Sequence, residues 1–482
     1  MGPIDLIVFF GYLIGILTFG LTFAKRTVSR EEFLVAGRGM GWVPIGLSVM
    51  VTVFSAVNYT AFTGEVAAHG LYVLMVLPVF VIVAFPVTKY VIPLYHHGKL
   101  LSAYELLERR FDVRVRRLAS GLFIVWRVFW MATVLYATCA LMATVLDTNP
   151  YGLIVLVGFS AAAYTVAGGM RSVMWTDVAQ FVVLFGGLVI AVMVTSSSEG
   201  GILALIRGAA RAGLTRPFYP FDPLILSWDP RLRMTLWSCL IGGLTAFMAR
   251  YSADQMVVQR YFTARSLGDA RRGFWLNVVC AMAALLCLGM LGMAVNAHAL
   301  RTSVPGEALR PIEQFARFVV ALPGGLSGLL GAGLLASAMS SIDSGIHSCS
   351  TAFVTDFVKH NGDRRESLRT DRLLTFGIST VAIAVACVVD RLGSVFEIAN
   401  RIVNGFGSPL LALFLLGWFS RRATSRGVLV GGICGAAWSA YTGFFIKGIA
   451  LHYYAVLNLI GTLVFCVLFS FVFSRGSSQK QN

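Results

Sequence analysis

Five serines and an aspartate interrupt an apolar run in the stretch ASAMSSIDSGIHS, which begins at Ala336. Because residues three and four apart share one helical face, the serines form one stripe. The stripe is formed by four of them, Ser337, Ser340, Ser341 and Ser344, and Ser348 continues it. Such hydroxyls can coordinate an alkali cation if backbone carbonyls complete the shell, or they can simply allow close helix packing. Asp343 favours the cation site, because packing needs no carboxylate.

A second carboxylate, Asp177, lies about 9 Å along an apolar span that starts near Ser172. An ionisable group at that depth requires a partner or a function. Its hard, anionic oxygens suit Na⁺, and the group can also carry a proton. The alternative is an ion pair with a loop arginine such as Arg171.

One arginine, Arg127, lies deep in an apolar span beside Trp126. A fixed guanidinium facing a cavity can hold a substrate carboxylate with two hydrogen bonds. The alternatives are an internal salt bridge to Asp177 or Asp343, or a span boundary that is misplaced. Charges near the span ends are better explained as helix caps and gate salt bridges. They are Glu105, Glu108, Asp254 and Arg260.

The composition predicts an integral membrane protein, since 57% of the 482 residues are hydrophobic and only 13% are charged. The net charge of +16 resides in short loops, where lipid and membrane orientation explain it better than nucleic acid does. No nucleotide-binding loop, HExxH or GxSxG motif is present, and the cysteines form no CxxC pair. We therefore expect neither an enzyme nor a transition-metal site.

Hydropathy predicts an all-α protein with about thirteen transmembrane helices. Basic loops predict an extracellular N-terminus and a cytoplasmic C-terminus, and only the long loop 197–233 is a basic outer one. The predicted spans are 4–25, 43–67, 72–96, 118–146, 150–168, 172–196, 234–262, 274–298, 322–358, 372–390, 394–419, 425–447 and 452–474.

The second span carries polar residues between glycines, and the seventh carries Gly242 and Gly243 followed by polar residues, so each is expected to open in the middle. They are five spans apart, which fits two inverted five-helix repeats. The expected units are a first helix and linker (1–42), the first repeat (43–196), an extracellular loop (197–233), the second repeat (234–420) and two C-terminal helices with a short tail (421–482).

Five motifs in order give the chain a resemblance to the sodium:solute symporter family, whose core fold is of the LeuT type. They are EEFLVAGRGMGW (31–42), SAYELLERRF (102–111), GGMRSVMWTDVAQ (168–180), SADQMVVQRY (252–261) and LPGGLSGLLGAGLLASAMSSIDSGIHSCSTAFVTD (322–356). The resemblance implies Na⁺-driven uptake of a small organic solute by alternating access.

The resemblance also implies the sites. Sodium ligands would be the backbone carbonyls of Val51, Phe54 and Ser337 and the hydroxyls of Ser340 and Ser341. A second cation would lie at Asp177, Asp343 and Ser344, where Asp343 replaces a hydroxyl often found in the family and can bind sodium more tightly or take a proton. Substrate contacts would come from Ser55, Asn58, Tyr59, Thr60, Arg127 and Tyr251.

The run VFSAVNYTAF offers few polar groups for a sugar, so we expect an organic anion: a monocarboxylate, a sugar acid or an amino acid. Alternatives are proton-coupled or uncoupled transport, and sodium-coupled uptake of a sugar, polyol or vitamin. The expected partners are the solute, Na⁺ and membrane lipid, with no nucleic acid and no obligate protein partner. The expected location is the plasma membrane, or the inner membrane of a bacterium.

Overall fold

The computed structural model describes residues 2–215, 223–302, 311–358, 364–392 and 395–478, and across these ranges the regular structure is helical. Residue 394, with which one predicted span begins, lies outside them. The α-helices are α1 (Pro3–Leu21), α2 (Arg30–Val35), α3 (Trp42–Val53), α4 (Ala56–His69), α5 (Leu77–Pro86), α6 (Ile92–His97), α7 (Glu105–Arg110), α8 (Val113–Leu146), α9 (Pro150–Ser198), α10 (Ile202–Arg211), α11 (Gly243–Ala253), α12 (Gln255–Phe262), α13 (Leu267–Thr302), α14 (Pro311–Ala321), α15 (Leu326–Asp356), α16 (Arg364–Ala386), α17 (Val395–Phe419), α18 (Ser425–Phe445) and α19 (Leu451–Ser478). Shorter 3₁₀ or π segments are η1 (Thr22–Arg26), η2 (Ala36–Arg38), η3 (Leu71–Val76), η4 (Val87–Val91), η6 (Ser238–Gly242) and η7 (Val389–Leu392).

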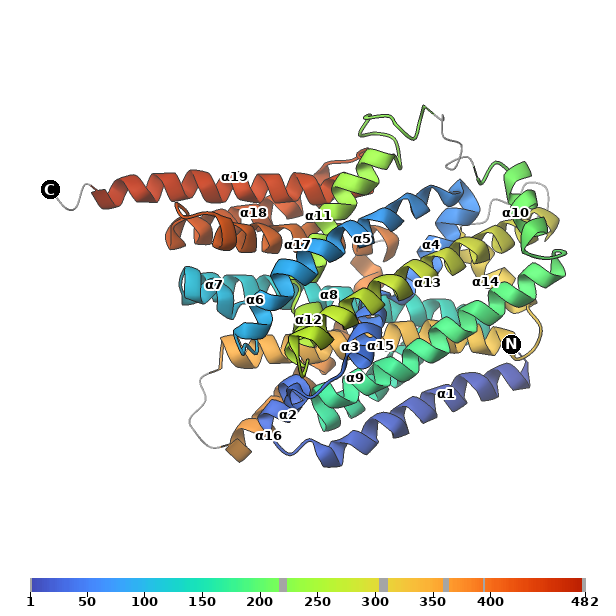
Figure 1. Ribbon diagram of the computed structural model, residues 1–482. Helices are drawn as coiled ribbons and strands as arrows, with labels where there is room; N and C mark the ends of the chain where they lie inside the picture. The colour runs from blue at the N-terminus through green and yellow to red at the C-terminus, as the bar shows by residue number, and fades with distance from the viewer. Residues whose placement is uncertain (1, 216–222, 303–310, 359–363, 393–394, 479–482) are drawn as a thin grey trace.

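Many of these helices are long and apolar enough to cross a bilayer. Within the described residues, 8 helices meet that condition, or 9 if the bent pair α3 and α4 is one span. A helix satisfies its own backbone hydrogen bonds, which lipid cannot do. The chain is therefore a multi-pass membrane protein, and its helices run roughly side by side (Figure 1).

The longest helix, α9, consists of two arms. Its 49 residues would measure about 74 Å if straight, more than twice the bilayer core. Gly169 interrupts it with φ 57° and ψ −150°, a backbone conformation that suits glycine. A Cβ atom there would lie 2.6 Å from the carbonyl oxygen of Phe33. The predicted spans 150–168 and 172–196 correspond to these two arms.

Two other helices open where the sequence predicts an opening. The helix axis bends by 63° between α3 and α4, with Phe54 and Ser55 in the break. The seventh span divides into α11 and α12 at Asp254, whose backbone is extended. The Asp254 side chain caps α12 by accepting a hydrogen bond from the Met256 N–H at 3.0 Å. Both breaks expose backbone groups inside the protein.

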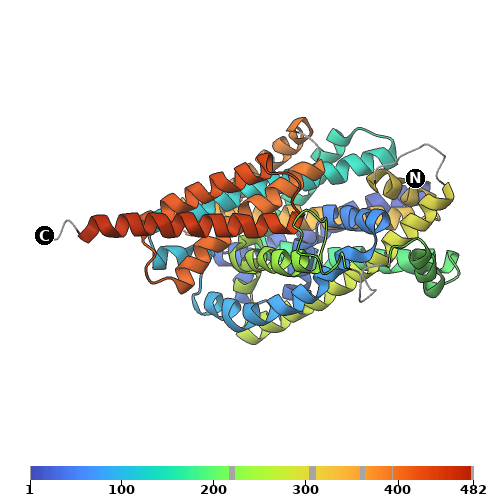
Figure 2. The ribbon, with the colours of Figure 1, turned by 90° about the horizontal axis from the view of Figure 1, so that it is seen from above.

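Helix α15, which carries the serine stripe, lies at the centre of the bundle. It packs against α1, α3, α8, α9 and α16, and all four stripe serines are fully buried. Helices α18 and α19 pack against each other and against α17, on the side of the bundle away from α1 (Figure 1). The two termini lie at opposite ends of the molecule in both views (Figures 1 and 2).

Candidate functional site

The serine stripe of α15 meets the broken end of α3. The Ser337 hydroxyl donates to the carbonyl oxygen of Phe54 at 2.7 Å, and the Ser340 hydroxyl donates to that of Val51 at 3.1 Å. These carbonyls are available because α3 ends at Val53, so no following turn uses them. The Ser341 hydroxyl donates to the Ser337 carbonyl at 3.2 Å. The five residues predicted to bind sodium therefore converge, with every one buried.

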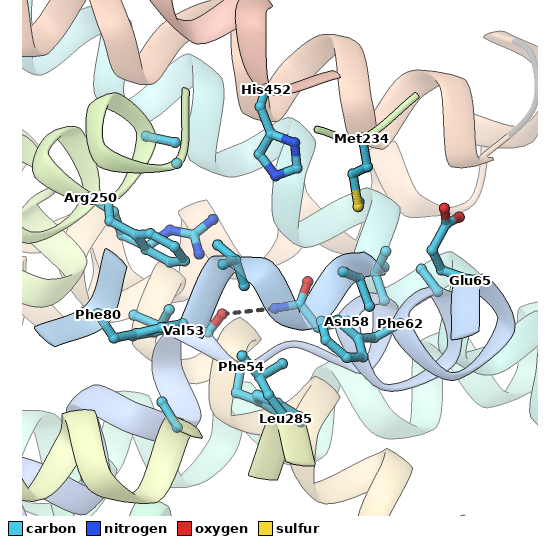
Figure 3. Close-up of a pocket in the computed structure, with 18 of the residues that line it drawn as sticks. Val53, Phe54, Asn58, Phe62, Glu65, Phe80, Met234, Arg250, Leu285 and His452 are labelled. Carbon is cyan, nitrogen blue, oxygen red and sulfur yellow. Dashed lines mark hydrogen bonds between the residues drawn. The ribbon is translucent and has the colours of Figure 1, made fainter. Parts of the chain in front are cut away.

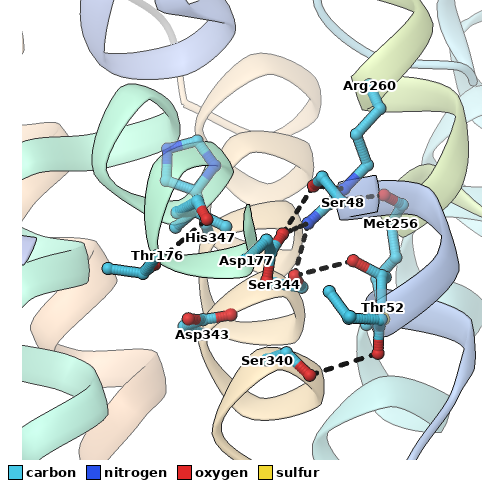
Figure 4. Close-up of polar contacts among 12 residues, drawn as sticks. Ser48, Thr52, Thr176, Asp177, Met256, Arg260, Ser340, Asp343, Ser344 and His347 are labelled. Carbon is cyan, nitrogen blue, oxygen red and sulfur yellow. Dashed lines mark hydrogen bonds and ion pairs between the residues drawn. The ribbon is translucent and has the colours of Figure 1, made fainter. Parts of the chain in front are cut away.

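A buried arginine occupies the neighbourhood of Asp177 (Figure 4). Arg260 of α12 lies 3.3 Å from the Asp177 carboxylate and also donates to the hydroxyls of Ser48 and Ser344. Ser48 in turn donates to Asp177 at 2.5 Å, and Thr52 lies 3.0 Å from Ser344 through their hydroxyls. The partner of Asp177 is thus Arg260 and not Arg171, which pairs with Glu32.

The other acid, Asp343, has no cationic side chain within ion-pair distance among the described residues. Its Oδ2 accepts a hydrogen bond from the Tyr164 hydroxyl at 2.6 Å. Its Oδ1 has no hydrogen-bond partner, and neither has the Oδ1 of Asp177. Two carboxyl groups and one guanidinium thus share this buried region, and only Asp177 pairs with the guanidinium.

Arg127 forms an internal ion pair. It donates to Asp254 at the break between α11 and α12, and its guanidinium lies 4.0 Å from the ring centre of Trp126. Asp254 caps α12 and pairs with Arg127, and Arg260 pairs with Asp177, so both make the expected cap or salt-bridge contacts, and each side chain is only 1% exposed. The break in the seventh span explains this, because it turns α12 inward and buries both ends.

A cavity of about 580 Å³ lies beside the five residues predicted to bind sodium. Its walls include parts of α4, α5, α11, α13 and the loop before α19 (Figure 3). Phe54, whose carbonyl oxygen accepts the hydrogen bond from the Ser337 hydroxyl, also lines this cavity. At its edge, Glu65 and Arg233 form a two-point ion pair with distances of 2.6 and 2.7 Å. The cavity and the serine stripe therefore share the broken segment of α3 and α4.

Of the six residues predicted to contact substrate, only Asn58 lines this cavity. Ser55 and Tyr59 are buried with hydroxyls that lack a partner, and Thr60 bonds to its own helix. Tyr251 is buried behind the cavity wall, where its hydroxyl accepts from Asn277 at 3.4 Å. The break brings this segment close to the cavity, but the helical phase of α4 turns most of these side chains away.

The sequence pattern does not single out Arg250 and Arg260 for the site. Arg250 lines the cavity, and Arg260 reaches Asp177. Both lie in the predicted span 234–262, so the rule that selects Arg127 for its depth also applies to Arg250. For Arg260 the signal is weak, because it lies near the predicted end of that span.

Comparisons with known proteins agree with this geometry. The family model described as the sodium:solute symporter family matches residues 33–435. The chain belongs to the sodium:solute symporter family. This symporter is 28% identical to the sodium/sialic acid symporter NanT of Aliivibrio fischeri, with 97% of the chain and 92% of the relative covered. It is also 28% identical to human sodium-coupled monocarboxylate transporter 1, with 91% and 73% covered.

A solved structure supports the same fold. The symporter superposes on a Na⁺-coupled sialic acid symporter in a substrate-bound, outward-open state with a TM-score of 0.87, 25% identity and 98% of each chain covered. The predicted LeuT-type core is therefore confirmed. The prediction that the protein is a transporter and not an enzyme is confirmed as well. The wall made by Gly448, Ala450 and His452 lies beyond the residues that the family model matches.

Proposed function

We propose that the protein is a sodium-coupled symporter that imports a small organic anion by alternating access. The observation that carries the proposal is the meeting of the α15 hydroxyls with the carbonyls at the broken end of α3. Hydroxyl and carbonyl oxygens are hard, neutral ligands that suit an alkali cation. Broken helices of this kind hold coupling ions in transporters.

In this proposal sodium binds to five oxygens, namely the carbonyls of Val51, Phe54 and Ser337 and the hydroxyls of Ser340 and Ser341. The hydroxyls now donate to the carbonyls at 2.7 to 3.2 Å. A cation between them would accept the oxygen lone pairs that these bonds leave free. Because Phe54 also lines the cavity, sodium binding would fix one wall of the solute site.

A second cation is proposed at Asp177, Asp343 and Ser344. The support is the charge balance, since Arg260 compensates only one of the two buried carboxylates. The unpartnered Oδ1 atoms of Asp177 and Asp343 are available ligands. Arg260 already binds the Ser344 hydroxyl, so a second cation would have to share that ligand or displace the arginine.

The solute is proposed to be an organic anion. The relatives named above transport sialic acid and monocarboxylates by their names, and both are carboxylates. The cavity presents arginine side chains at Arg231, Arg233 and Arg250 and one carboxylate at Glu65. A net positive lining favours an anionic solute.

The proposed topology has thirteen spans, an extracellular N-terminus and a cytoplasmic C-terminus in a plasma or bacterial inner membrane. Nine apolar spans become ten when the two arms of α9 are counted separately. The helices η6 with α11 and α12, then α16 and α17, would supply the remaining three. An odd number agrees with termini at opposite ends of the molecule.

Uptake into proteoliposomes tests the function. Radiolabelled lactate, N-acetylneuraminate and 4-hydroxybenzoate would be offered with an inward Na⁺ gradient, with equal Na⁺ on both sides, or with K⁺ in its place. We expect accumulation of at least one solute only with the Na⁺ gradient. Accumulation that depends on a pH gradient and is independent of Na⁺ would establish proton coupling instead.

A further inference from the structure

We infer that the solute carboxylate binds to Arg250, and that the solute is a monocarboxylate with an aromatic or branched aliphatic body. The inference rests on the proposed function and specifies its substrate. Arg250 lies on α11, one helical turn before the break at Asp254, and lines the cavity. Figure 3 shows its side chain directed toward the space above Asn58.

Arg250 has no hydrogen bond or ion pair to any residue that the structure describes. Its nearest aromatic partner is Phe247, whose ring centre lies 5.9 Å from the guanidinium carbon. A charged side chain inside a membrane protein is costly unless it is compensated. Since no described residue pairs with Arg250, an anion from outside is the missing partner. A carboxylate suits the planar guanidinium, which can donate two parallel hydrogen bonds to it.

Arg127 is excluded from this role by its surroundings. Asp254, four residues after Arg250, is already paired with Arg127, and Arg127 does not line the cavity. Arg250 and Asp254 both lie at the end of α11, and because Asp254 pairs with Arg127, one positive charge is left over. That charge is on Arg250, which is the arginine that faces the empty space.

Two residues that line the cavity have buried polar atoms without a hydrogen-bond partner. Asn277 is fully buried, and its Oδ1 accepts no hydrogen bond while its Nδ2 donates to Tyr251. The ring Nδ1 of His452 is buried and equally without a partner. A buried acceptor without a donor is unfavourable, because it has lost its hydrogen bonds to water. A solute with a hydroxyl or amine besides its carboxylate would satisfy such an acceptor.

The rest of the wall determines the body of the solute. Five aromatic side chains line the cavity: Phe54, Phe62, Phe80, Phe247 and Trp130. A sugar acid carries many hydroxyls, and most of them would lose their hydrogen bonds to water against such a wall. An aromatic or branched aliphatic body is instead stabilised by apolar burial.

Binding to the purified protein in detergent tests the inference with matched probes. The first pair is 4-hydroxybenzoate and 4-hydroxybenzamide, which have nearly the same size and shape but carry a charged carboxylate and a neutral amide, and N-acetylneuraminate is the sugar acid. Calorimetry and thermal shift would be measured in NaCl and in choline chloride. We expect 4-hydroxybenzoate to bind in NaCl at least about tenfold more tightly than either other probe.

The variants then locate the carboxylate. Arg250→Gln should weaken 4-hydroxybenzoate binding by at least about tenfold, and Arg250→Lys should restore part of the loss. Arg211→Gln, an exposed arginine on α10 outside the cavity, should bind as the wild type does. Stabilisation by Na⁺ alone should persist in Arg250→Gln, which shows that this variant is folded with an intact cation site.

Three results would overturn the inference. They are equal affinity of the wild type and Arg250→Gln for 4-hydroxybenzoate, binding of the amide or the sugar acid as tight as that of the benzoate, and no benzoate binding at about 10 mM. In each case, Na⁺ stabilisation that remains intact would show that the proposed symport survives while the solute assignment fails. Loss of Na⁺ stabilisation in the wild type would count against the symport itself.

Discussion

The guanidinium of Arg260 lies 3.3 Å from the carboxylate of Asp177, and both side chains are at most 1% exposed. This ion pair joins α12 to α9, and Ser48 of α3 bonds to both partners. Because α12 follows the break at Asp254, no continuous helix holds it in place. The buried pair therefore fixes α12 beside the proposed cation region.

Replacing Arg260 by glutamine should destabilise the protein by about 3–5 kcal/mol, because it leaves the Asp177 charge buried and unpaired. Adding Asp177→Asn should recover much of that loss, since the remaining groups are neutral. Chemical denaturation of the purified protein in detergent would measure both, with Na⁺ replaced by K⁺. Strictly additive losses in the double variant would contradict the pairing.

Replacing Arg127 by glutamine should lower the amount of folded protein while leaving the solute affinity of the folded fraction within about threefold of the wild type. The physical reason is that Arg127 compensates Asp254 and does not line the cavity. Size-exclusion chromatography would report folding, and calorimetry would report affinity. A large loss of solute affinity in well-folded protein would instead indicate that Arg127 binds the solute carboxylate.

Removing the hydroxyls of Ser340 and Ser341 should raise the Na⁺ concentration for half-maximal stabilisation by about tenfold, because the proposed site loses two of its five oxygens. The readout is thermal shift against NaCl at constant ionic strength. Ser350→Ala is the matched control, since its hydroxyl bonds to Thr375 of α16 and lies away from α3. An unchanged Na⁺ curve in the double variant would leave the stripe with a packing role only.

Replacing Gly169 by alanine should destabilise the junction of the two α9 arms by about 1–3 kcal/mol. The residue has φ 57°, and a Cβ atom would lie 2.6 Å from the Phe33 carbonyl oxygen. Gly152→Ala in the first arm is the control, because its Cβ would meet nothing within 4 Å. If both variants melt at the same temperature, the strained backbone at Gly169 is unimportant.

Much of the architecture follows from local pattern. Apolar segments long enough to span the bilayer predict helices, because the helix is the one conformation in which a single segment in lipid satisfies its own backbone hydrogen bonds. The polar runs around Ser55 and Asp254, each in an apolar span that also carries glycines, predict the two breaks, which are present. The serine stripe is a matter of helical phase alone, so its single face is predictable from spacing.

The pairing of charges is not predictable in that way. Arg127 and Arg250 are both deep in apolar spans, and nothing local distinguishes the arginine that Asp254 compensates from the one that faces the cavity. Likewise the partner of Asp177 lies 83 residues away, on a helix whose direction depends on a break.

The sequence by itself determined that this protein is a helical membrane protein, where its helices open, and which residues carry oxygens for a cation. Only the tertiary structure decided which carbonyls those oxygens meet, which arginines are compensated, and that Arg250 faces the cavity. The physical reason is that helical period assigns a side chain to a face, whereas the neighbour opposite that face depends on how distant helices pack.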